Sequence, residues 1–379
     1  MPTYPKSAVR LALLQHTGLL AMRREGLAAT VHRVGAVQMD PMRIVAQSHL
    51  LSLRLRRGWA GESALSQALA RGEVLEANLK ERCLLAAADR AAAVVSFQRQ
   101  RQRQSLSRHG VLEAADAVLR EIAERGPLRS RDIASSHRVP GFWDPSPQAQ
   151  KATTLCLEIL AAEGRLLVVA RRGGERVYAL PERLFPDWPA LLADGTGARL
   201  AALTHYGRTL GVFRPSDPYL GWLHLDQGGR RRVLDEMVAT GRWHAFLLPD
   251  GESYACDASL VPLLAEPSRP PRGVRILPPL DNLLWDRRRL LDLFGFPYTW
   301  EAYTPVGRRQ VGPYGMPVLL GDRLMGEIDA RRDAQGALQG RFVPRAALSV
   351  QAGRSIERAF LALCRDVRPS PREVPDSGR

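Results

Sequence analysis

The sequence contains little lysine and little cysteine. Only three of its 54 basic residues are lysines, at positions 6, 80 and 151, so arginine carries nearly all of the positive charge. The four cysteines stand far apart, with no Cys-x-x-Cys pair and no Cys/His spacing typical of zinc ligands. They are Cys83, Cys156, Cys256 and Cys364. We therefore expect no disulfide framework, no metal site and no cofactor.

Several catalytic and targeting patterns are also missing. The sequence has no Gly-x-Ser-x-Gly, no P-loop and no His-Glu-x-x-His, so it gives no signal for a hydrolase triad, an NTPase or a zinc protease. The N-terminal apolar stretch is interrupted by Arg10, Gln15, His16 and Arg23, and a small-residue cleavage site is missing. It predicts an amphipathic helix, with neither a signal peptide nor a membrane span, and hence a cytoplasmic protein without a membrane partner.

Positive charge is what the sequence has in excess. It carries 54 basic and 39 acidic residues, which gives a formal net charge of +15 and a pI of about 10.5. Guanidinium groups match phosphates and base edges bidentately, so a polyanion such as nucleic acid is the favoured partner. A GC-rich genome also explains the preference for arginine over lysine, although it does not explain the net charge. The length predicts about two to four folded domains.

One pattern occurs twice in the middle of the chain. Residues 157–180 (LEILAAEGRLLVVARRGGERVYAL) and 234–257 (LDEMVATGRWHAFLLPDGESYACD) share apolar positions, a Gly-Arg pair at 164 and 241, and a later Tyr. Each copy predicts a helix that ends at the glycine, followed by two short strands joined by a glycine-containing turn. Helical segments precede both copies, with Ser130 predicted to cap a short helix before the first. This is the order of a winged helix-turn-helix.

The opening segment predicts a third and more degenerate copy, with helices at 7–25 and 28–35, a helix from Pro41 and an alternating strand LLSLRLRR. We therefore predict an α+β protein of about three tandem winged helix-turn-helix domains followed by a β-rich C-terminal domain. The predicted domains are residues 1–108, 109–188, 189–268 and 269–362, followed by a flexible tail at 363–379.

Two basic stretches are candidate nucleic-acid contacts. The first, FQRQRQRQSLSRHG, contains Arg99 and Arg101. Arginines at every second position line one face of an extended segment and two faces of a helix, and a solvated helix face is an equally open interpretation. The second is the turn Arg171-Arg172-Gly173-Gly174 in the first repeat, which predicts a glycine-tipped basic hairpin that can follow a DNA groove.

The stretch VGAVQMDP, residues 34–41, places two polar residues at the end of an apolar run. Proline disfavours the α conformation in the residue before it, so Asp40 is expected to be extended. Side chains alternate in an extended segment, which puts Gln38 and Asp40 on one side and Met39 on the other. Asp-Pro is also an ordinary helix start, with Asp40 as N-cap. The two interpretations are compatible, because a capping carboxylate keeps one oxygen free.

Such a pair suits hydrolysis of an N-glycosidic bond. The sugar gains oxocarbenium character as the bond breaks, and a carboxylate stabilises that charge and takes a proton from water. An amide orients the water, since it offers one acceptor and two donors. Cationic alkylated purines are good leaving groups and need little acid assistance.

The segment HRVGAVQMDPMRIVAQSHLLSLRLRR resembles the core of the AlkZ/YcaQ family of winged-helix DNA glycosylases, whose signature is Gln, any residue, then Asp or Gln. The likeness continues through GPLRSRDI, AAEGRLLVVARRGGERVYALPERLFPDW, GRTLGVF, LLWDRRRLLDLFGF and YTPVGRRQ…MPVLLGDRLMGEID. It implies that Gln38 and Asp40 are the catalytic pair. The Asp-bearing form is associated with the YcaQ branch, which removes N7-alkylpurines and unhooks DNA interstrand crosslinks. In the resembling segments, Arg43, Arg308 and Arg309 are further candidate contacts to DNA.

The sequence departs from the family pattern at two places. After LARGEVLE the family commonly has an aromatic-rich stretch with a His, and here Lys80 stands at the His position while Glu81 is retained. Both are candidates to lie near the substrate. A Tyr-Gly-Tyr-like stretch of the family is replaced by Val311-Gly312-Pro313. These changes bear on the choice of lesion more than on the chemistry.

Two hypotheses follow from the sequence. The first is a monomeric, metal-independent and monofunctional glycosylase of base-excision repair, which acts on double-stranded DNA with alkylated or crosslinked bases through Asp40 and Gln38. Lys80 is the only lysine near the motif, and a Schiff-base lyase would need its pKa to be lowered by burial. The second is a non-catalytic winged-helix DNA-binding protein or transcription regulator.

Overall fold

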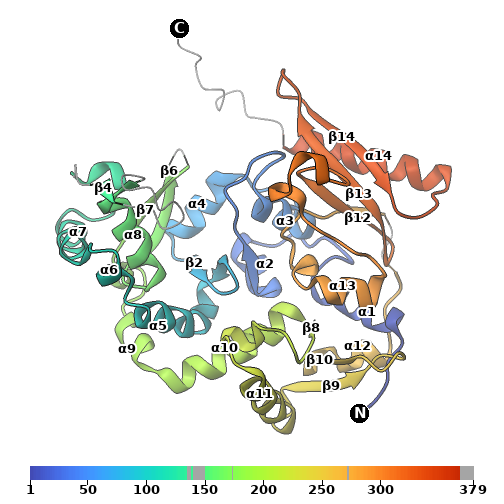
Figure 1. Cartoon of the computed structure of the whole chain (residues 1–379), viewed down its shortest axis with the longest axis horizontal. Helices are drawn as coiled ribbons and strands as arrows, with labels where there is room; N and C mark the ends of the chain where they lie inside the picture. The colour runs from blue at the N-terminus through green and yellow to red at the C-terminus, as the bar shows by residue number, and fades with distance from the viewer. Residues whose placement is uncertain (135–137, 140–149, 173, 271–272, 368–379) are drawn as a thin grey trace.

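The computed structural model of the chain describes residues 1–134, 138–139, 150–172, 174–270 and 273–367. Helices alternate with small antiparallel sheets, so the protein is of mixed α/β class. In Figure 1 the segment around α7 and α8 lies at the left, the α10–β10 segment at the bottom, and the C-terminal sheet with α14 at the upper right. Among the described residues, no helix has the combination of length and apolar character that crossing a membrane requires.

The N-terminal part contains a three-stranded sheet of order β1-β3-β2, surrounded by helices. The helices are α1 (Lys6–His16), α2 (Leu27–Val34), α3 (Ser48–Arg57) and α4 (Glu62–Ala70). The strands are β1 (Ala36–Gln38), β2 (Val74–Asn78) and β3 (Arg82–Ala86).

The next part begins with linking helices and ends with a hairpin. The linking helices are η1 (Ala87–Ala93), α5 (Val94–Gln102) and α6 (Ser105–Arg108). They are followed by α7 (Leu112–Arg125), η2 (Ser130–Asp132), β4 (Arg138–Val139), β5 (Gln150–Lys151) and α8 (Ala152–Ala162). The hairpin is β6 (Leu167–Arg172) with β7 (Glu175–Ala179), and η3 (Pro181–Arg183) and α9 (Trp188–Ala193) follow it.

The third part again has a helix, a short extended stretch, a second helix and a hairpin, and its strands form a sheet of order β8-β10-β9. Its elements are α10 (Gly195–Leu210), β8 (Val212–Phe213), η4 (Leu220–Trp222), α11 (Gln227–Ala239), β9 (Trp243–Leu247) and β10 (Ser253–Asp257). The short helices η5 (Ala258–Leu260) and α12 (Val261–Ala265) lead out of it.

The C-terminal part is built on a four-stranded antiparallel sheet of order β11-β12-β13-β14. The strands are β11 (Val274–Ile276), β12 (Gly315–Leu320), β13 (Arg323–Arg332) and β14 (Leu338–Pro344). Between β11 and β12 lie η6 (Asn282–Leu284), α13 (Arg287–Phe294), η7 (Glu301–Tyr303) and η8 (Val306–Arg308). Helix α14 (Val350–Asp366) ends the described chain.

One helix–hairpin unit occurs three times in the described chain. In each unit a helix ends at a glycine of positive φ, an extended stretch follows, and a later helix ends at a second glycine of positive φ before a hairpin. The second glycines are Gly72, Gly164 and Gly241, with φ of 65°, 67° and 68°. After each of them, the next N–H bonds to the carbonyl five residues back at 2.9–3.0 Å. This shared helix end is the Schellman motif, which glycine makes without strain.

The extended stretch of each unit pairs with the second strand of its own hairpin. The pairs are Ala36 with Leu85, Leu128 with Tyr178, and Val212 with Cys256. The helix, glycine and hairpin that the sequence predicted at 157–180 and 234–257 are therefore confirmed.

The predictions for the N-terminal copy are wrong in three elements. The first helix ends at His16 and not at residue 25, no helix starts at Pro41, and LLSLRLRR belongs to α3. Its leucines alternate because α3 is covered on several sides: Leu50 and Leu53 pack against the α2 and α4 side, whereas Leu51 packs against the C-terminal sheet. The hairpin of the first unit is β2–β3.

The structure also differs from the sequence predictions at one helix cap and places two predicted domain boundaries inside helices. Ser130 does not cap a helix; Arg129 is the N-cap of η2, and Ser130 Oγ instead shares a hydrogen bond of 2.6 Å with Thr154 Oγ1. The predicted boundaries after residues 188 and 362 fall inside α9 and α14, and α14 continues to Asp366. The rest of the predicted tail, from residue 368, lies outside the described residues.

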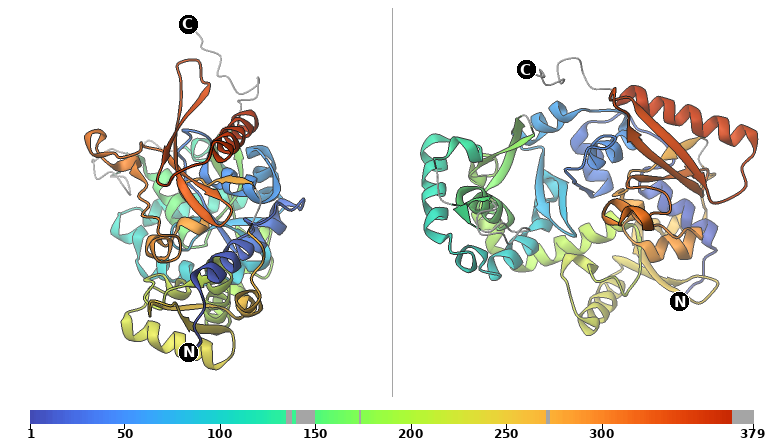
Figure 2. Two further views of the ribbon diagram at one scale, coloured as in Figure 1. Left: turned by 90° about the vertical axis from the view of Figure 1, so that its right-hand side faces the viewer. Right: turned by 45° about the horizontal axis from the view of Figure 1, so that its top comes forward.

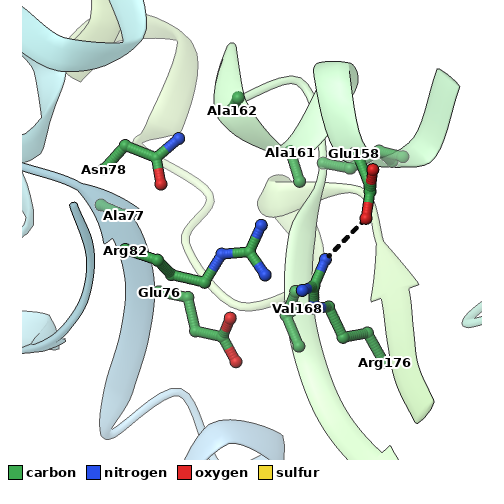
Figure 3. A pocket seen from close by; sticks show the side chains of 10 residues that line it. Glu76, Ala77, Asn78, Arg82, Glu158, Ala161, Ala162, Val168 and Arg176 are labelled. Carbon is green, nitrogen blue, oxygen red and sulfur yellow. Dashed lines mark hydrogen bonds and ion pairs between the residues drawn. The ribbon is translucent and has the colours of Figure 1, made fainter. Parts of the chain in front are cut away.

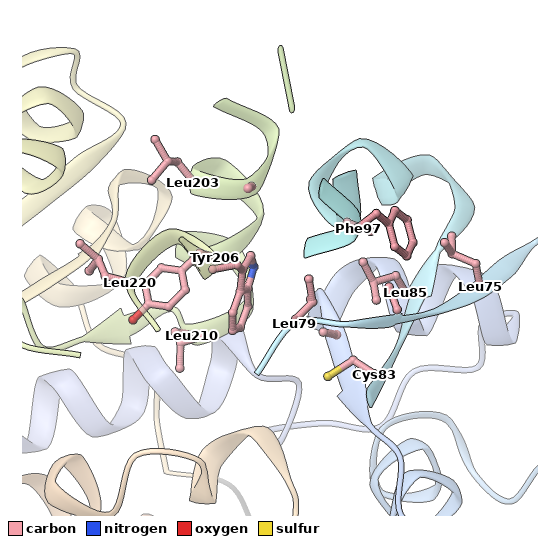
Figure 4. Close-up of a cluster of buried hydrophobic side chains, with 14 of the residues drawn as sticks. Leu75, Leu79, Cys83, Leu85, Phe97, Leu203, Tyr206, Leu210 and Leu220 are labelled. Carbon is pink, nitrogen blue, oxygen red and sulfur yellow. The ribbon is translucent and has the colours of Figure 1, made fainter. Parts of the chain in front are cut away.

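The largest hydrophobic cluster runs across the unit boundaries. It joins Leu75 and Leu85 of the first unit with Phe97 of α5 and with Leu203 and Tyr206 of α10 (Figure 4). A shared core of this kind fixes the units relative to one another.

Gly164 lies where the second unit meets this core. A Cβ on Gly164 would come within 2.8 Å of Cγ of the fully buried Phe97, whereas a Cβ on Gly241, at almost the same φ, would meet nothing within 4 Å. We expect Gly164→Ala to lower the free energy of unfolding by about 1–3 kcal/mol more than Gly241→Ala, because only the first substitution adds overpacking to the backbone strain. Urea denaturation of both variants measures the difference, and equal losses would show that Phe97 moves aside without cost.

Candidate active site

Gln38 is the last residue of β1, at the edge of the first unit's sheet. It lies opposite Cys83 of β3, and the next N–H, that of Met39, donates to the carbonyl of Arg82 at 2.8 Å. Met39 is buried with Val37 in the core of the first unit, whereas Gln38 and Asp40 are half-buried. The side chains therefore have the burial expected of an extended segment with Met39 turned inward.

Asp40 does not cap a helix, so that interpretation of Asp-Pro is wrong. Its Oδ1 accepts a hydrogen bond of 2.7 Å from the N–H of Met42, two residues on, which is a local turn. Helix α3 begins only at Ser48, after Gln47 as N-cap. Within the part of the chain that the structure describes, Asp40 Oδ2 forms no hydrogen bond.

Contacts from the C-terminal part explain why residues 41–47 are not helical. Arg332 Nη2 donates to the carbonyl of Val45 at 2.7 Å, and the Tyr314 hydroxyl donates to the carbonyl of Ala46 at 3.3 Å. These tertiary bonds use carbonyls that a helix would need. The segment after Asp40 is thus a loop whose shape is set by a distant part of the chain.

Tyr314 also brings the C-terminal part close to Asp40. The ring is 1% exposed. Burial, and in addition the negative charge of Asp40, raise the pKa of Tyr314 above its ordinary value, so this hydroxyl is a neutral donor at physiological pH.

The strand that carries Gln38 is attached to the C-terminal part at its other end. Asn282 Nδ2 donates to the carbonyl of Ala36 at 2.8 Å and to that of Val34 at 3.1 Å. The next residue back, Asp281, forms a buried ion pair with Arg56 of α3, at 2.6 and 3.0 Å. Sequence analysis missed these residues, although polar Asp-Asn inside the apolar run PPLDNLLW was a signal.

Arg171, predicted to contact DNA, is used inside the molecule. Its guanidinium bonds to Glu76 of β2 at 2.7 and 3.0 Å, and its N–H bonds to Ser66 Oγ at 3.0 Å. Burial, together with the charges of Arg171 and Arg43, lowers the pKa of nearby His49 to about 3, so His49 is neutral. Arg171 thereby links the hairpin of the second unit to the first unit.

Arg99 and Arg101 are likewise engaged. They lie in α5, so they do not share one extended face. Arg99 Nη1 donates to the carbonyl of Trp222 at 2.9 Å, and Arg101 Nε donates to that of Glu163 at 2.9 Å. Both join neighbouring elements, but only Arg99 is half-buried, whereas Arg101 remains exposed.

Four of the predicted DNA contacts are exposed, namely Arg101 and three arginines without a bond to a backbone carbonyl of the described residues: Arg43, Arg172 and Arg308. Arg43 has a side chain that is 53% exposed, pairs with Glu62 at 2.9 Å, and comes close to Gly174 at the tip of the β6–β7 hairpin. Arg309 is half-buried and donates to the carbonyl of Thr304 at 2.8 Å. Gly173 of the predicted basic turn lies outside the described residues.

Lys80 and Glu81 form the turn between β2 and β3, beyond the end of β1. The Lys80 ammonium donates to the carbonyl of Trp285 at 2.9 Å and lies 5.5 Å from the ring centre of Tyr219. Burial lowers the pKa of Lys80 from its ordinary value. Lys80 lines a cavity of about 210 Å³ with Arg214, Asp217, Trp222, Asp286 and Arg287. Glu81 is exposed.

A second cavity lies between β2 and the second unit (Figure 3). Glu76, Asn78 and Arg82 face Glu158 and Arg176, which pair at 3.4 Å, and burial raises the pKa of Glu158. The cavity volume is about 30 Å³. A cavity of this size holds no more than a few water molecules, so it is too small to receive a base.

Other reaction types find little support around the motif. Burial raises the pKa of the Cys83 thiol, opposite Gln38, to about 12, so it is not a nucleophile at neutral pH. Among the described residues, no three His, Cys, Asp or Glu side chains are grouped so that they could bind a metal ion.

A family model shows that the chain is of the DNA glycosylase class. The model of the family "DNA glycosylase AlkZ-like" matches residues 31–365, and the chain belongs to this family. The DNA glycosylase AlkZ of Streptomyces sahachiroi has a similar structure, with a TM-score of 0.65 at 17% sequence identity. The similarity covers 96% of this chain and 97% of that one. The predicted family resemblance is confirmed.

Proposed function

We propose that the protein is a monofunctional DNA glycosylase that releases N7-alkylated or bulky purines from double-stranded DNA and unhooks interstrand crosslinks formed through such bases. The observation that carries the proposal is the half-buried Asp40 carboxylate, which is held through Oδ1 two residues after Gln38, the last residue of β1. Membership in the AlkZ-like family supports the reaction class. The Asp-bearing motif favours the alkylpurine substrates.

In the proposed reaction the bond between the sugar C1′ and the purine nitrogen breaks with both electrons going to the base. A purine alkylated at N7 carries a positive charge, so it leaves as a neutral base and needs no proton from the enzyme. The sugar gains positive charge, which Asp40 Oδ2 stabilises. Asp40 then takes one proton from the water whose oxygen bonds to C1′, and the products are the free base and an abasic site.

Gln38 is assigned to orienting this water. Its amide offers an acceptor and two donors, and its backbone lies in a regular pairing with Cys83 that fixes the direction of the side chain. Tyr314 supplies a buried, neutral environment beside Asp40 from the C-terminal part.

We also propose that the three helix–hairpin units are winged helices that contact the DNA backbone. The repeated order of helix, extended stretch, helix and hairpin supports this assignment. Arg43, Arg172 and Arg308 are the proposed phosphate contacts, since their side chains are exposed. A monomer suffices for this arrangement, because all three units belong to one chain.

The monofunctional assignment depends on Lys80. Its pKa is lowered by burial, which a Schiff-base amine requires, but its ammonium is bound to the carbonyl of Trp285 and lies within 6 Å of the ring centres of Tyr219 and Trp285. We therefore assign Lys80 to joining the β2–β3 turn to the C-terminal part.

The test uses duplex DNA with one N7-methylguanine or one nitrogen-mustard interstrand crosslink. Wild-type protein is expected to produce abasic sites, scored as strand cleavage after alkali, and no covalent product with borohydride. A transcription regulator would bind undamaged DNA with sequence preference and would cleave neither substrate. Tight binding with no cleavage of either lesion would refute the enzymatic proposal for these substrates.

A further inference from the structure

The loop between Glu301 and Gln310 has two strongly exposed apolar side chains. Tyr303 is 81% exposed and Val306 is 78% exposed, more than any other large apolar side chain in the described part of the chain. Arg308 on the same loop is exposed as well. In the left view of Figure 2, the orange segment that contains this loop extends from the body of the molecule.

The base of this loop is firmly closed. The buried Glu301 carboxylate accepts hydrogen bonds from the N–H groups of Gln310, Val311 and Gly312, at 2.7, 2.9 and 3.0 Å. Burial disfavours the charged form, but these three bonds outweigh it and lower the pKa of Glu301. A carboxylate with three backbone donors is a rigid closure, so the exposed tip is held in one direction.

The tip is ordered by its own contacts. The Tyr303 ring meets that of Trp300 edge to face at 5.8 Å, and Arg309 Nε donates to the carbonyl of Thr304 at 2.8 Å. Pro305 precedes the short helix η8 and restricts its own φ. An exposed apolar pair on a preorganised loop loses little conformational freedom on binding.

The base of the loop leads into Tyr314, whose hydroxyl donates to the carbonyl of Ala46 in the segment that follows Asp40. The residues that Glu301 binds lead directly into Tyr314, whose pKa responds to the charge of Asp40. The closed base of the loop therefore lies two residues before the side chain that adjoins Asp40.

We propose that Tyr303 and Val306 form a wedge that enters the base stack of double-stranded DNA beside the lesion, while Arg308 contacts the adjacent phosphate. The inference rests on the proposed function and adds residues that separate the damaged nucleotide from its neighbours. Apolar side chains that enter between base steps unstack them at a cost of a few kcal/mol, which exposes the glycosidic bond.

DNA fits this loop better than a protein partner. A stable protein interface needs about 1,000 Å² or more of buried surface, and two side chains beside an arginine provide far less. A single base step is about the size of one aromatic ring. The net charge of +15 and the exposed Arg308 favour a phosphate-bearing partner.

The test measures unstacking separately from base release. Duplexes carry the fluorescent base 2-aminopurine next to a non-hydrolysable abasic analogue. The fluorescence of 2-aminopurine rises when this base unstacks from its neighbours. We expect wild-type protein to raise the fluorescence about threefold or more. Tyr303→Phe should give the same rise, and the double variant Tyr303→Ala/Val306→Ala should give none. The matched control is Val350→Ala/Leu361→Ala on α14, which removes two exposed apolar side chains elsewhere and should leave the signal intact.

A second arm uses N7-methylguanine in a fully paired duplex and in a three-nucleotide bulge. We expect Tyr303→Ala/Val306→Ala to release the base about tenfold or more slowly than wild type from the paired duplex, and near the wild-type rate from the bulge, where the stack is already open. An unchanged fluorescence rise in this variant, or an equal loss on both substrates, would overturn the wedge. If wild type unstacks DNA but releases no base, the wedge stands and the proposed function fails.

Discussion

Asp40→Asn is expected to slow base release from alkylated DNA by about 10²- to 10⁴-fold, the usual contribution of a general base. The amide keeps the shape of the side chain, and its oxygen can still accept the hydrogen bond from Met42 N–H. It loses the negative charge that stabilises the sugar and the basic oxygen that takes the proton. The measurement is the single-turnover rate on a duplex with one N7-methylguanine, with enzyme in excess.

The matched control for this variant is Glu73→Gln. Glu73 is an exposed carboxylate of the same unit, paired with Arg71 at 2.7 Å, so the substitution makes the same change in net charge away from the motif. Its rate should stay within about twofold of wild type, because a distant exposed charge affects mainly long-range attraction of DNA. A rate for Asp40→Asn above one tenth of the wild-type rate would exclude Asp40 as the base.

Asp281→Ala is expected to lower the free energy of unfolding by about 3–5 kcal/mol, because it leaves a buried arginine without its counter-charge. The Arg56 and Asp281 side chains are 2% and 0% exposed. Asp281 also accepts bonds from Ser52 Oγ at 3.0 Å and from the N–H of Leu283 at 3.1 Å. The loss is measured by urea denaturation at neutral pH.

Asp366→Ala is the control for this effect. It breaks another ion pair of the same helix α3, between Arg54 and Asp366, in which the two side chains are 16% and 41% exposed. Exposed pairs contribute about 0–1 kcal/mol, since water solvates both charges after the pair is broken. Losses of similar size for the two variants would show that the Arg56–Asp281 pair is solvated in solution.

Asp281→Ala is also expected to affect base release. Asp281 precedes Asn282, whose amide bonds to the carbonyls of Val34 and Ala36, just before Gln38. A folded Asp281→Ala protein at low temperature is therefore expected to release base more slowly than wild type, although Asp281 does not approach the substrate in the proposed reaction.

The helix–glycine–hairpin copies were predictable because their determinants are local. Gly164 and Gly241 end their helices through bonds to carbonyls within the preceding five residues, and the strands that follow are joined by short turns. The same signal was present at Gly72, in ARGEVLEANLKERCLLA, but the alternating leucines of α3 suggested a strand elsewhere. A helix covered on several sides loses the one-sided pattern by which helices are recognised.

The sequence by itself determined the charge of the protein, the Gln-x-Asp segment and two of the three helix–hairpin units, because composition and bonds within a few residues decide these features. Only the tertiary structure decided that Asp40 follows a strand without starting a helix, and that Arg99, Arg101 and Arg171 bond inside the molecule. Their partners lie 62 to 123 positions away in the chain. Whether an arginine is free for DNA depends on which distant carbonyl or carboxylate the folding of the chain brings beside it.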